Sequence, residues 1–141
     1  MAATLLKVTA SVTESAREEI EDHLSEASAW IECVSTGALG ASECAVCGSP
    51  GPTEAHHLAG KFNSEVTVPV CRPCHRRLSE RQNGWDPRWV LPGNPPDLKE
   101  SFVLRGLSDL CEERGRLNAA YHILGKRLRA AYAKRARGSS S

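Results

Sequence analysis

Residues 44–78 read CAVCGSPGPTEAHHLAGKFNSEVTVPVCRPCHRRL, and their cysteines decide how this part of the chain folds. Two C-x2-C pairs are separated by 23 residues: Cys44, Cys47, Cys71 and Cys74. Two residues between paired thiols let both reach one tetrahedral ion from a tight turn, and Gly48 suits such a turn. Because four thiolates leave no open coordination position, the spacing predicts a structural zinc ion that activates no water.

The remainder of this stretch is rich in turn residues. One β-rich run, VTVPV at 66–70, contains a proline that favours a short or edge strand. Pro73 suits the first position of a helix, which we expect to end at Asn83-Gly84. We expect Trp85 and Trp89, in the proline-rich connector that follows, to pack over the zinc module. Stacking on nucleic acid is the alternative for these two rings.

Helical periodicity precedes the module. Apolar residues recur every three or four positions from 16 to 34, which predicts one helix that begins near Thr13. Ser15 and Glu18 fit a capping box at its start, and Gly37 ends the pattern. Residues 4–12 are compatible with either a short helix or a strand.

A second helical pattern follows the module, from Asp97 to about residue 137. Its apolar stripe has heptad-like steps and is interrupted once, by Arg114. The stripe comprises Val103, Leu107, Leu110, Leu117, Tyr121, Leu124, Leu128 and Ala131. Three glycines favour a kink or two shorter helices: Gly106, Gly115 and Gly125. Such a stripe must be buried against the first helix, the zinc module or a second copy of the chain, so a homodimer through the C-terminal helix is one expectation.

The composition is that of a globular protein with few aromatic residues. Apolar residues make up 40% of the 141 residues, charged residues 25% and aromatic residues 5%. We see no signal-peptide pattern and no apolar stretch of membrane-span length, so we expect a cytoplasmic protein with no membrane partner. In that reducing compartment, clustered cysteines bind metal more often than they form disulfides. Cys33 and Cys111 stand alone in helical patterns, and we expect them to be buried small hydrophobes.

The net charge of +1 is unevenly distributed along the chain. Residues 1–43 carry two basic and eight acidic side chains, whereas residues 99–141 carry ten basic and four acidic ones. A basic end can bind polyanions locally. The simpler alternative is that the two ends attract each other.

Residues 44–89 resemble the HNH nuclease family. Its members carry a His-His or Asp-His pair before a loop, an Asn, and a final CxxCH at the head of a helix. In this sequence the pair is His56-His57, and the histidine of CxxCH is His75. The resemblance implies a zinc-stabilised ββα-metal module for this stretch and does not extend to the helical patterns on either side. Together, module and patterns predict a small α+β fold and divide the chain into an N-terminal helical region, the HNH-like zinc module and a C-terminal helical region with a basic tail: 1–43, 44–91 and 92–141.

The same resemblance implies a metal-dependent endonuclease that hydrolyses phosphodiester bonds, and we expect DNA as the substrate. His57 matches the general base that activates water. His56 and His75 match ligands of a catalytic divalent ion, usually Mg²⁺, that polarises the phosphoryl oxygen and stabilises the leaving 3′ oxygen. Neutral imidazole suits both roles, since its ordinary pKa is about 6.5. The alternative is that these histidines are ordinary polar surface residues or alternative zinc ligands.

One position departs from the family pattern. In many members an Asn stands five residues before the final CxxC, and here Val66 occupies that place. Asn63, three positions earlier, is the nearest residue that could orient His57, and we expect it to take this catalytic role. Two imidazole ligands suit manganese, nickel or zinc as well as magnesium, and Glu54 and Glu65 are nearby carboxylates that could assist.

Basic residues close to the histidines are expected to contact phosphate. They lie on or beside the helix that carries His75, or in the loop after the histidine pair: Arg72, Arg76, Arg77, Arg81 and Lys61. A solvated charged face is the alternative for these residues. Two other functions remain open for the chain: a non-catalytic zinc-stabilised nucleic-acid-binding module, with Val66 marking a lost active site, and a protein-interaction adaptor built on the helical regions.

Overall fold

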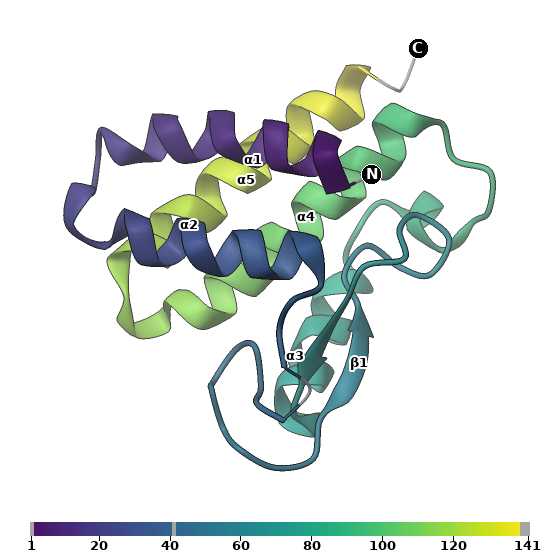
Figure 1. Ribbon diagram of the computed structural model, residues 1–141. Coiled ribbons are helices and arrows are strands. Elements are labelled where there is room, and N and C mark those ends of the chain that lie inside the picture. Colours follow the sequence, from purple (N-terminus) through teal and green to yellow (C-terminus); the bar gives the residue numbers. More distant parts are fainter. Residues whose placement is uncertain (1, 41, 139–141) are drawn as a thin grey trace.

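The computed structural model describes residues 2–40 and 42–138. Four long helices form a helical body in this part of the chain: α1 (Ala2–Arg17), α2 (Glu21–Thr36), α4 (Pro96–Arg114) and α5 (Ala119–Gly138) (Figure 1). An antiparallel hairpin and one further helix lie to one side of this body: β1 (Glu54–His57), β2 (Thr67–Val70) and α3 (Arg72–Gln82). Two short 3-10 helices complete the order: η1 (Pro87–Val90) before α4, and η2 (Gly115–Leu117) between α4 and α5. The predicted small α+β fold is confirmed.

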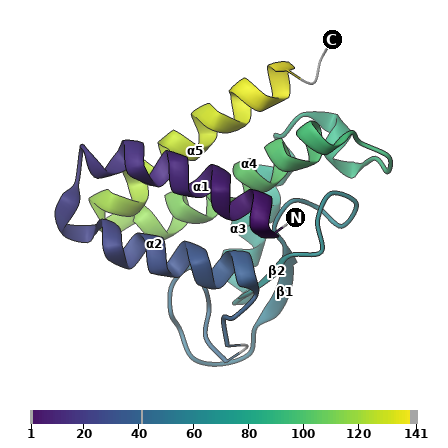
Figure 2. The same ribbon diagram turned by 45° about the horizontal axis from the view of Figure 1, so that its top comes forward.

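The N-terminal region forms two helices where the periodicity predicted one. The break falls between Arg17 and Glu21, so the predicted capping box of Ser15 and Glu18 is wrong, and residues 4–12 are helical. The break lets α1 fold back against α2 and α5 (Figure 2), which contact it along its length. Apolar residues on both sides of the turn are thereby buried: Ala16, Leu24 and Ala27. Tertiary packing overrides the continuous helical pattern here.

The C-terminal pattern divides into α4 and α5, as the two-helix alternative predicted. Most of the apolar stripe is buried: Val103, Leu107, Leu110, Tyr121, Leu124 and Leu128. Leu117 is the exception at 101% relative exposure, because it falls in η2 between the helices and not on a helical face. The two helices bury the stripe against each other within one chain, and the homodimer stays a prediction.

Helix α4 is central to the fold, with neighbours in α1, α3 and α5. Small residues on it allow this crowding. The Ser108 hydroxyl donates to the Gly125 carbonyl of α5 at 2.7 Å, and a Cβ on Gly125 would lie 2.8 Å from Cγ of Glu112. Gly106 faces the backbone of Leu58, just after β1. The glycines that weaken the helical pattern therefore permit close packing of helices and hairpin.

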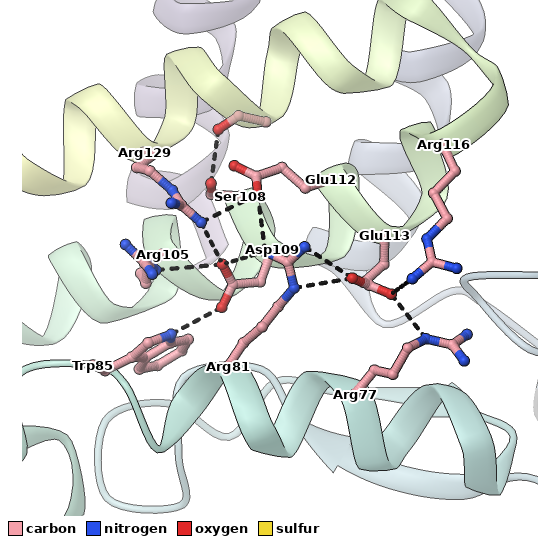
Figure 3. A network of polar contacts seen from close by, with 11 residues as sticks. Arg77, Arg81, Trp85, Arg105, Ser108, Asp109, Glu112, Glu113, Arg116 and Arg129 are labelled. Atoms are coloured by element: carbon pink, nitrogen blue, oxygen red, sulfur yellow. Dashed lines mark hydrogen bonds and ion pairs between the residues drawn. The ribbon is translucent and has the colours of Figure 1, made fainter.

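A polar network joins the hairpin–helix unit to α4 (Figure 3). Buried Trp85, in the connector after α3, donates its indole N–H to Asp109 at 2.8 Å and stacks on Phe102 at a centroid distance of 5.9 Å. Trp85 therefore ties the connector to α4. The Trp89 ring instead packs close to Gly60 in the loop after β1, where a Cβ would lie 2.8 Å from the ring.

Two arginines connect regions that are distant in sequence. Arg127 of α5 pairs with Glu19 in the turn after α1, so the basic and acidic ends of the chain do attract each other. Arg114, which interrupts the apolar stripe, donates to the carbonyl of Ala45 at 2.7 Å. Because Ala45 lies between the first two cysteines, this bond fixes the cysteine turn against the helical body.

Candidate functional site

The four cysteines of the two C-x2-C pairs come together as predicted. Their Sγ atoms all lie within 4.8 Å of one another: Cys44, Cys47, Cys71 and Cys74. Gly48 adopts the left-handed conformation (φ 72°) that the turn after the first pair requires. The second pair occupies the start of α3, with Cys71 at its N-cap. Four sulfur donors at this spacing can hold a metal ion such as zinc.

The thiols of the four-cysteine cluster differ in how readily they ionise. Burial raises the pKa of the Cys44 thiol, but the backbone N–H groups of Cys47, Cys71 and Val46 outweigh it and lower the pKa from 9.0 to about 6. Burial and the neighbouring thiols raise the pKa of Cys74. The Arg77 guanidinium donates to Cys74 Sγ at 3.2 Å. A bound cation would relieve the mutual repulsion of thiolates that makes simultaneous ionisation unfavourable.

The hairpin places the two adjacent histidines on opposite faces. In its antiparallel register His56 pairs with Val68 and His57 with Thr67. Side chains alternate along a strand, so His56 is 3% exposed whereas His57 is exposed. The ring of His56 packs edge-on against His75 of α3, with a centroid distance of 5.3 Å. The structure therefore brings together the two imidazoles that the resemblance implies as metal ligands.

Burial and charge keep His56 neutral at physiological pH. Desolvation is the larger cause, followed by the charges of His75 and His57, and together they lower its pKa from 6.5 to about 4. His75 Nδ1 lies 3.3 Å from Oε2 of Glu54 on β1, and Arg72 Nε donates to Oε1 of the same carboxylate at 3.3 Å. These two contacts lower the pKa of Glu54, with His75 the larger cause.

The histidines and Glu54 do not form a ready-made three-ligand site. Over residues 2–40 and 42–138, only the four cysteines bring three or more possible ligand atoms within 4.8 Å of one another. His56, His75 and Glu54 are neighbours in pairs, and their side chains would have to adjust to bind one ion. Glu65, the other carboxylate considered from the sequence, lies in the loop between the strands and is exposed.

The backbone of His57 is fixed although its ring is exposed. Its carbonyl accepts from Nε2 of Gln82, at the end of α3, at 3.0 Å and from the backbone N–H of Gly60 at 3.3 Å. The next residue, Leu58, lies against Gly106 of α4. The His57 ring is therefore accessible to a substrate, while its backbone stays in a fixed position.

Asn63 is a buried anchor of the loop after His57. It is 2% exposed, and its Nδ2 donates to the carbonyls of Ala59 at 2.8 Å and Trp89 at 2.9 Å. Its Oδ1 accepts from Asn94 at 2.9 Å. The described contacts of the amide are thus with the loop and the connector, and any effect on His57 is through the backbone. Val66, at the family's usual Asn position, accepts from the Leu58 N–H through its backbone at 3.1 Å.

The five basic residues predicted to contact phosphate divide into two groups. Arg72, Arg76 and Lys61 are exposed. Arg81 instead pairs with Glu112 at 2.9 Å and Glu113 at 2.8 Å, and Arg77 donates to Glu113 at 2.9 Å (Figure 3). These two guanidinium groups join α3 to α4, which favours a structural role for them over phosphate contact.

Three residues hold the end of β1 and the loop that follows it, and none of them was assigned a role at the site from the sequence: Gln82, Asn94 and Gly106. Gln82 ends a predicted helix, and Asn94 lies in a proline-rich connector, so nothing local indicates that either reaches the hairpin. Gly106 was visible as a glycine within a helical pattern, a signal of close backbone approach. Its partner on the far side could not be identified without the fold.

Within the described residues, no helix combines the length and apolar character needed to cross a membrane. No family model, curated protein or solved structure matches this chain.

Proposed function

We propose that this chain is a metal-dependent HNH-type endonuclease that hydrolyses phosphodiester bonds in DNA. One observation supports it above the others: the four-cysteine frame carries a hairpin and a helix in which buried His56 packs on His75 at 5.3 Å, while His57, the next residue, projects to solvent from the other face of the strand. The observed hairpin–helix order is the one that the family resemblance implies.

The metal-binding part of the proposal concerns two imidazoles and a carboxylate. His56, which is neutral because burial lowers its pKa to about 4, has a lone pair available for a metal at neutral pH. His75 and Glu54 would be the further ligands. Nitrogen donors of this kind suit Mn²⁺, Ni²⁺ or Zn²⁺ better than Mg²⁺. When bound, the ion supplies Lewis-acid stabilisation of the phosphoryl group and the leaving 3′ oxygen.

His57 takes the proton from the attacking water in this proposal. Its ring is exposed and can contact a water molecule, and its backbone is held by Gln82. Arg72, Arg76 and Lys61 are the exposed cations beside the histidines, and we assign contacts with the phosphate backbone to them. Arg77 and Arg81 are left out because Glu112 and Glu113 engage them.

The direct test is cleavage of supercoiled plasmid by the zinc-loaded full chain with Mg²⁺, Mn²⁺, Ni²⁺ or Zn²⁺ added separately. We expect cleavage by the wild type and a loss of at least about 100-fold in His57→Ala, the usual size of a general-base contribution. His23→Ala is the matched control, since His23 is an exposed histidine on α2. Equal rates for wild type and His57→Ala would exclude this mechanism.

A second function is favoured by the absence of a preformed three-ligand site for the catalytic ion in the described part of the chain. A zinc-stabilised nucleic-acid-binding module without catalysis would need the thiol frame and the exposed cations but no second metal. Salt-dependent DNA binding by the wild type, with no cleavage in any of the four metals, would select this function over the nuclease.

A further inference from the structure

The tip of the loop after His57 exposes an aromatic ring next to two lysines. Phe62 is 42% exposed, and the Lys61 ammonium lies 5.1 Å from the centroid of its ring. A pocket of about 520 Å³ is formed by residues 61–66 together with Lys99 from the start of α4. Single exposed apolar residues are normal on a protein surface, and Phe62 differs from the others because its ring lies beside a lysine at the edge of a pocket.

From this arrangement we infer a subsite for an unpaired nucleotide, with its base stacked on Phe62 and its phosphates beside Lys61 and Lys99. The inference rests on the proposed nuclease function and narrows its substrate to DNA with a single-stranded segment at the cleaved bond. Base–aromatic stacking tolerates any sequence but needs a base that is free of its duplex partner. The pocket volume is sufficient, since ligand sites typically measure about 300–1,000 Å³.

The loop that presents Phe62 is held rigidly. The Asn63 amide, next to Phe62, bonds to two carbonyls and to Asn94, and the Ser64 hydroxyl accepts from the Val66 N–H at 3.1 Å. A fixed aromatic platform loses little conformational freedom when a base stacks on it.

The subsite lies at a suitable distance from the proposed general base. Two successive turns separate them: Gly60 N donates to the His57 carbonyl at 3.3 Å, and Asn63 N donates to the Gly60 carbonyl at 3.2 Å. Each such turn spans less than about 7 Å between its end Cα atoms, so the loop tip lies within roughly 14 Å of His57. The stacked base is therefore placed within a few nucleotides of the phosphate that His57 would address.

Glu65 constrains the path of the bound DNA strand, because this acidic residue lines the same pocket and repels phosphate. We therefore place the sugar–phosphate backbone along Lys61 and Lys99 and the base toward Phe62. The logarithm of the binding constant falls as the logarithm of the salt concentration rises, and each of these lysines should make that slope steeper by about 0.7 for single strands. Replacing Lys61 or Lys99 by Gln should reduce that slope accordingly, whereas Glu65→Gln should leave binding unchanged or strengthen it.

The test measures fluorescence anisotropy of a labelled single-stranded oligonucleotide and of the matching duplex. Zinc-loaded His57→Ala protein is used as the parent so that neither probe is cut. We expect Phe62→Ala and Phe62→Leu to weaken single-strand binding by about 5- to 150-fold, the value of one stacked base, with little change for the duplex. Phe62→Trp should restore binding, and Leu117→Ala is the matched control at another exposed apolar residue.

Equal single-strand affinities for the parent and Phe62→Ala would overturn the subsite, and so would an equal loss for single strand and duplex. Folding of each variant is checked by its melting temperature. If Phe62→Ala has a lowered melting temperature, the comparison of Phe62→Leu with Phe62→Trp still tests the subsite. Cleavage by wild type without any Phe62 effect would leave the nuclease proposal standing and the subsite wrong. Phe62-dependent binding without cleavage in any metal would support the subsite and exclude the nuclease.

Discussion

Gly106 is the position where one added methyl group should disturb both the fold and the site. It lies in the buried middle of α4, and a Cβ there would be 2.0 Å from the carbonyl oxygen of Leu58, 2.8 Å from its carbonyl carbon and 2.9 Å from its Cγ. Two of these three atoms are backbone atoms of the residue after His57. Gly106→Ala therefore forces α4 and the end of β1 apart.

The size of the effect follows from these contacts. An ordinary contact between Cβ and oxygen needs more than about 3 Å, so the two backbones must separate by roughly 1 Å. Overpacking of this kind costs about 1–3 kcal/mol, offset by up to about 1 kcal/mol from the better helix propensity of Ala. We expect a net loss of about 1–2 kcal/mol and a fall in Tm of roughly 3–8 °C. A displacement of about 1 Å at a catalytic group can cost on the order of 100-fold in rate.

The assay compares thermal melts of wild type, Gly106→Ala and Gly138→Ala, followed by plasmid cleavage at a temperature where all three are folded. Gly138→Ala is the control, since a Cβ on this α5 residue meets nothing within 4 Å. It should melt at or slightly above the wild-type temperature and cut normally. If Gly106→Ala melts no lower than this control, the close packing of α4 on Leu58 is refuted.

Three further predictions concern the metal and the network of Figure 3. Purified protein should contain one zinc ion per chain by elemental analysis, and Cys71→Ser should lose it and melt at a clearly lower temperature, because zinc binding to such a site stabilises the fold. Trp85→Phe removes the N–H that donates to buried Asp109 at 2.8 Å, and should lower the free energy of unfolding by about 1–3 kcal/mol in urea titrations. Burial raises the pKa of Glu113, but Arg81, Arg77 and Arg116 outweigh it and hold the pKa below the usual value. The free energy of unfolding of wild type should therefore exceed that of Glu113→Gln fully above about pH 4.5, and the difference should disappear as the pH falls through the lowered pKa. Urea titrations of both proteins at a series of pH values would measure this difference.

Local signals in the sequence were sufficient for the metal frame. The spacing within each cysteine pair brings its two thiols together, in a tight turn at the first pair and at the start of α3 at the second, and this depends only on residues a few positions apart. Pro73 likewise placed the first turn of α3 correctly. Features of this kind can be read because neighbouring residues determine them without help from the rest of the fold.

Long-range contacts decided what the sequence could not show. Periodicity joined residues 13–36 into one helix, but the chain turns after Arg17 because α1 gains more from packing on α2 and α5 than from continuing straight. The sequence predicts that Arg81, on an exposed helix, contacts phosphate. The fold instead places Glu112 and Glu113, more than 30 residues away in the sequence, beside it. Charge complementarity between distant helices has no periodic signature, so only the folded structure identifies such pairs.

The backbone at the end of β1 supports the proposed site more strongly than the histidine rings themselves do. Three consecutive carbonyls are held from three directions: that of His57 by Gln82 of α3, that of Leu58 by close packing on Gly106 of α4, and that of Ala59 by Asn63. The thiol frame does not supply these contacts, since no cysteine lies in β1 or in the loop that follows it. Buried amides and a glycine-dependent contact are sensitive to substitution, and such features are expected where a side chain must stay in one position. The residue in that position is exposed His57, so under the proposed function the same three contacts would position the general base as well as stabilise the fold.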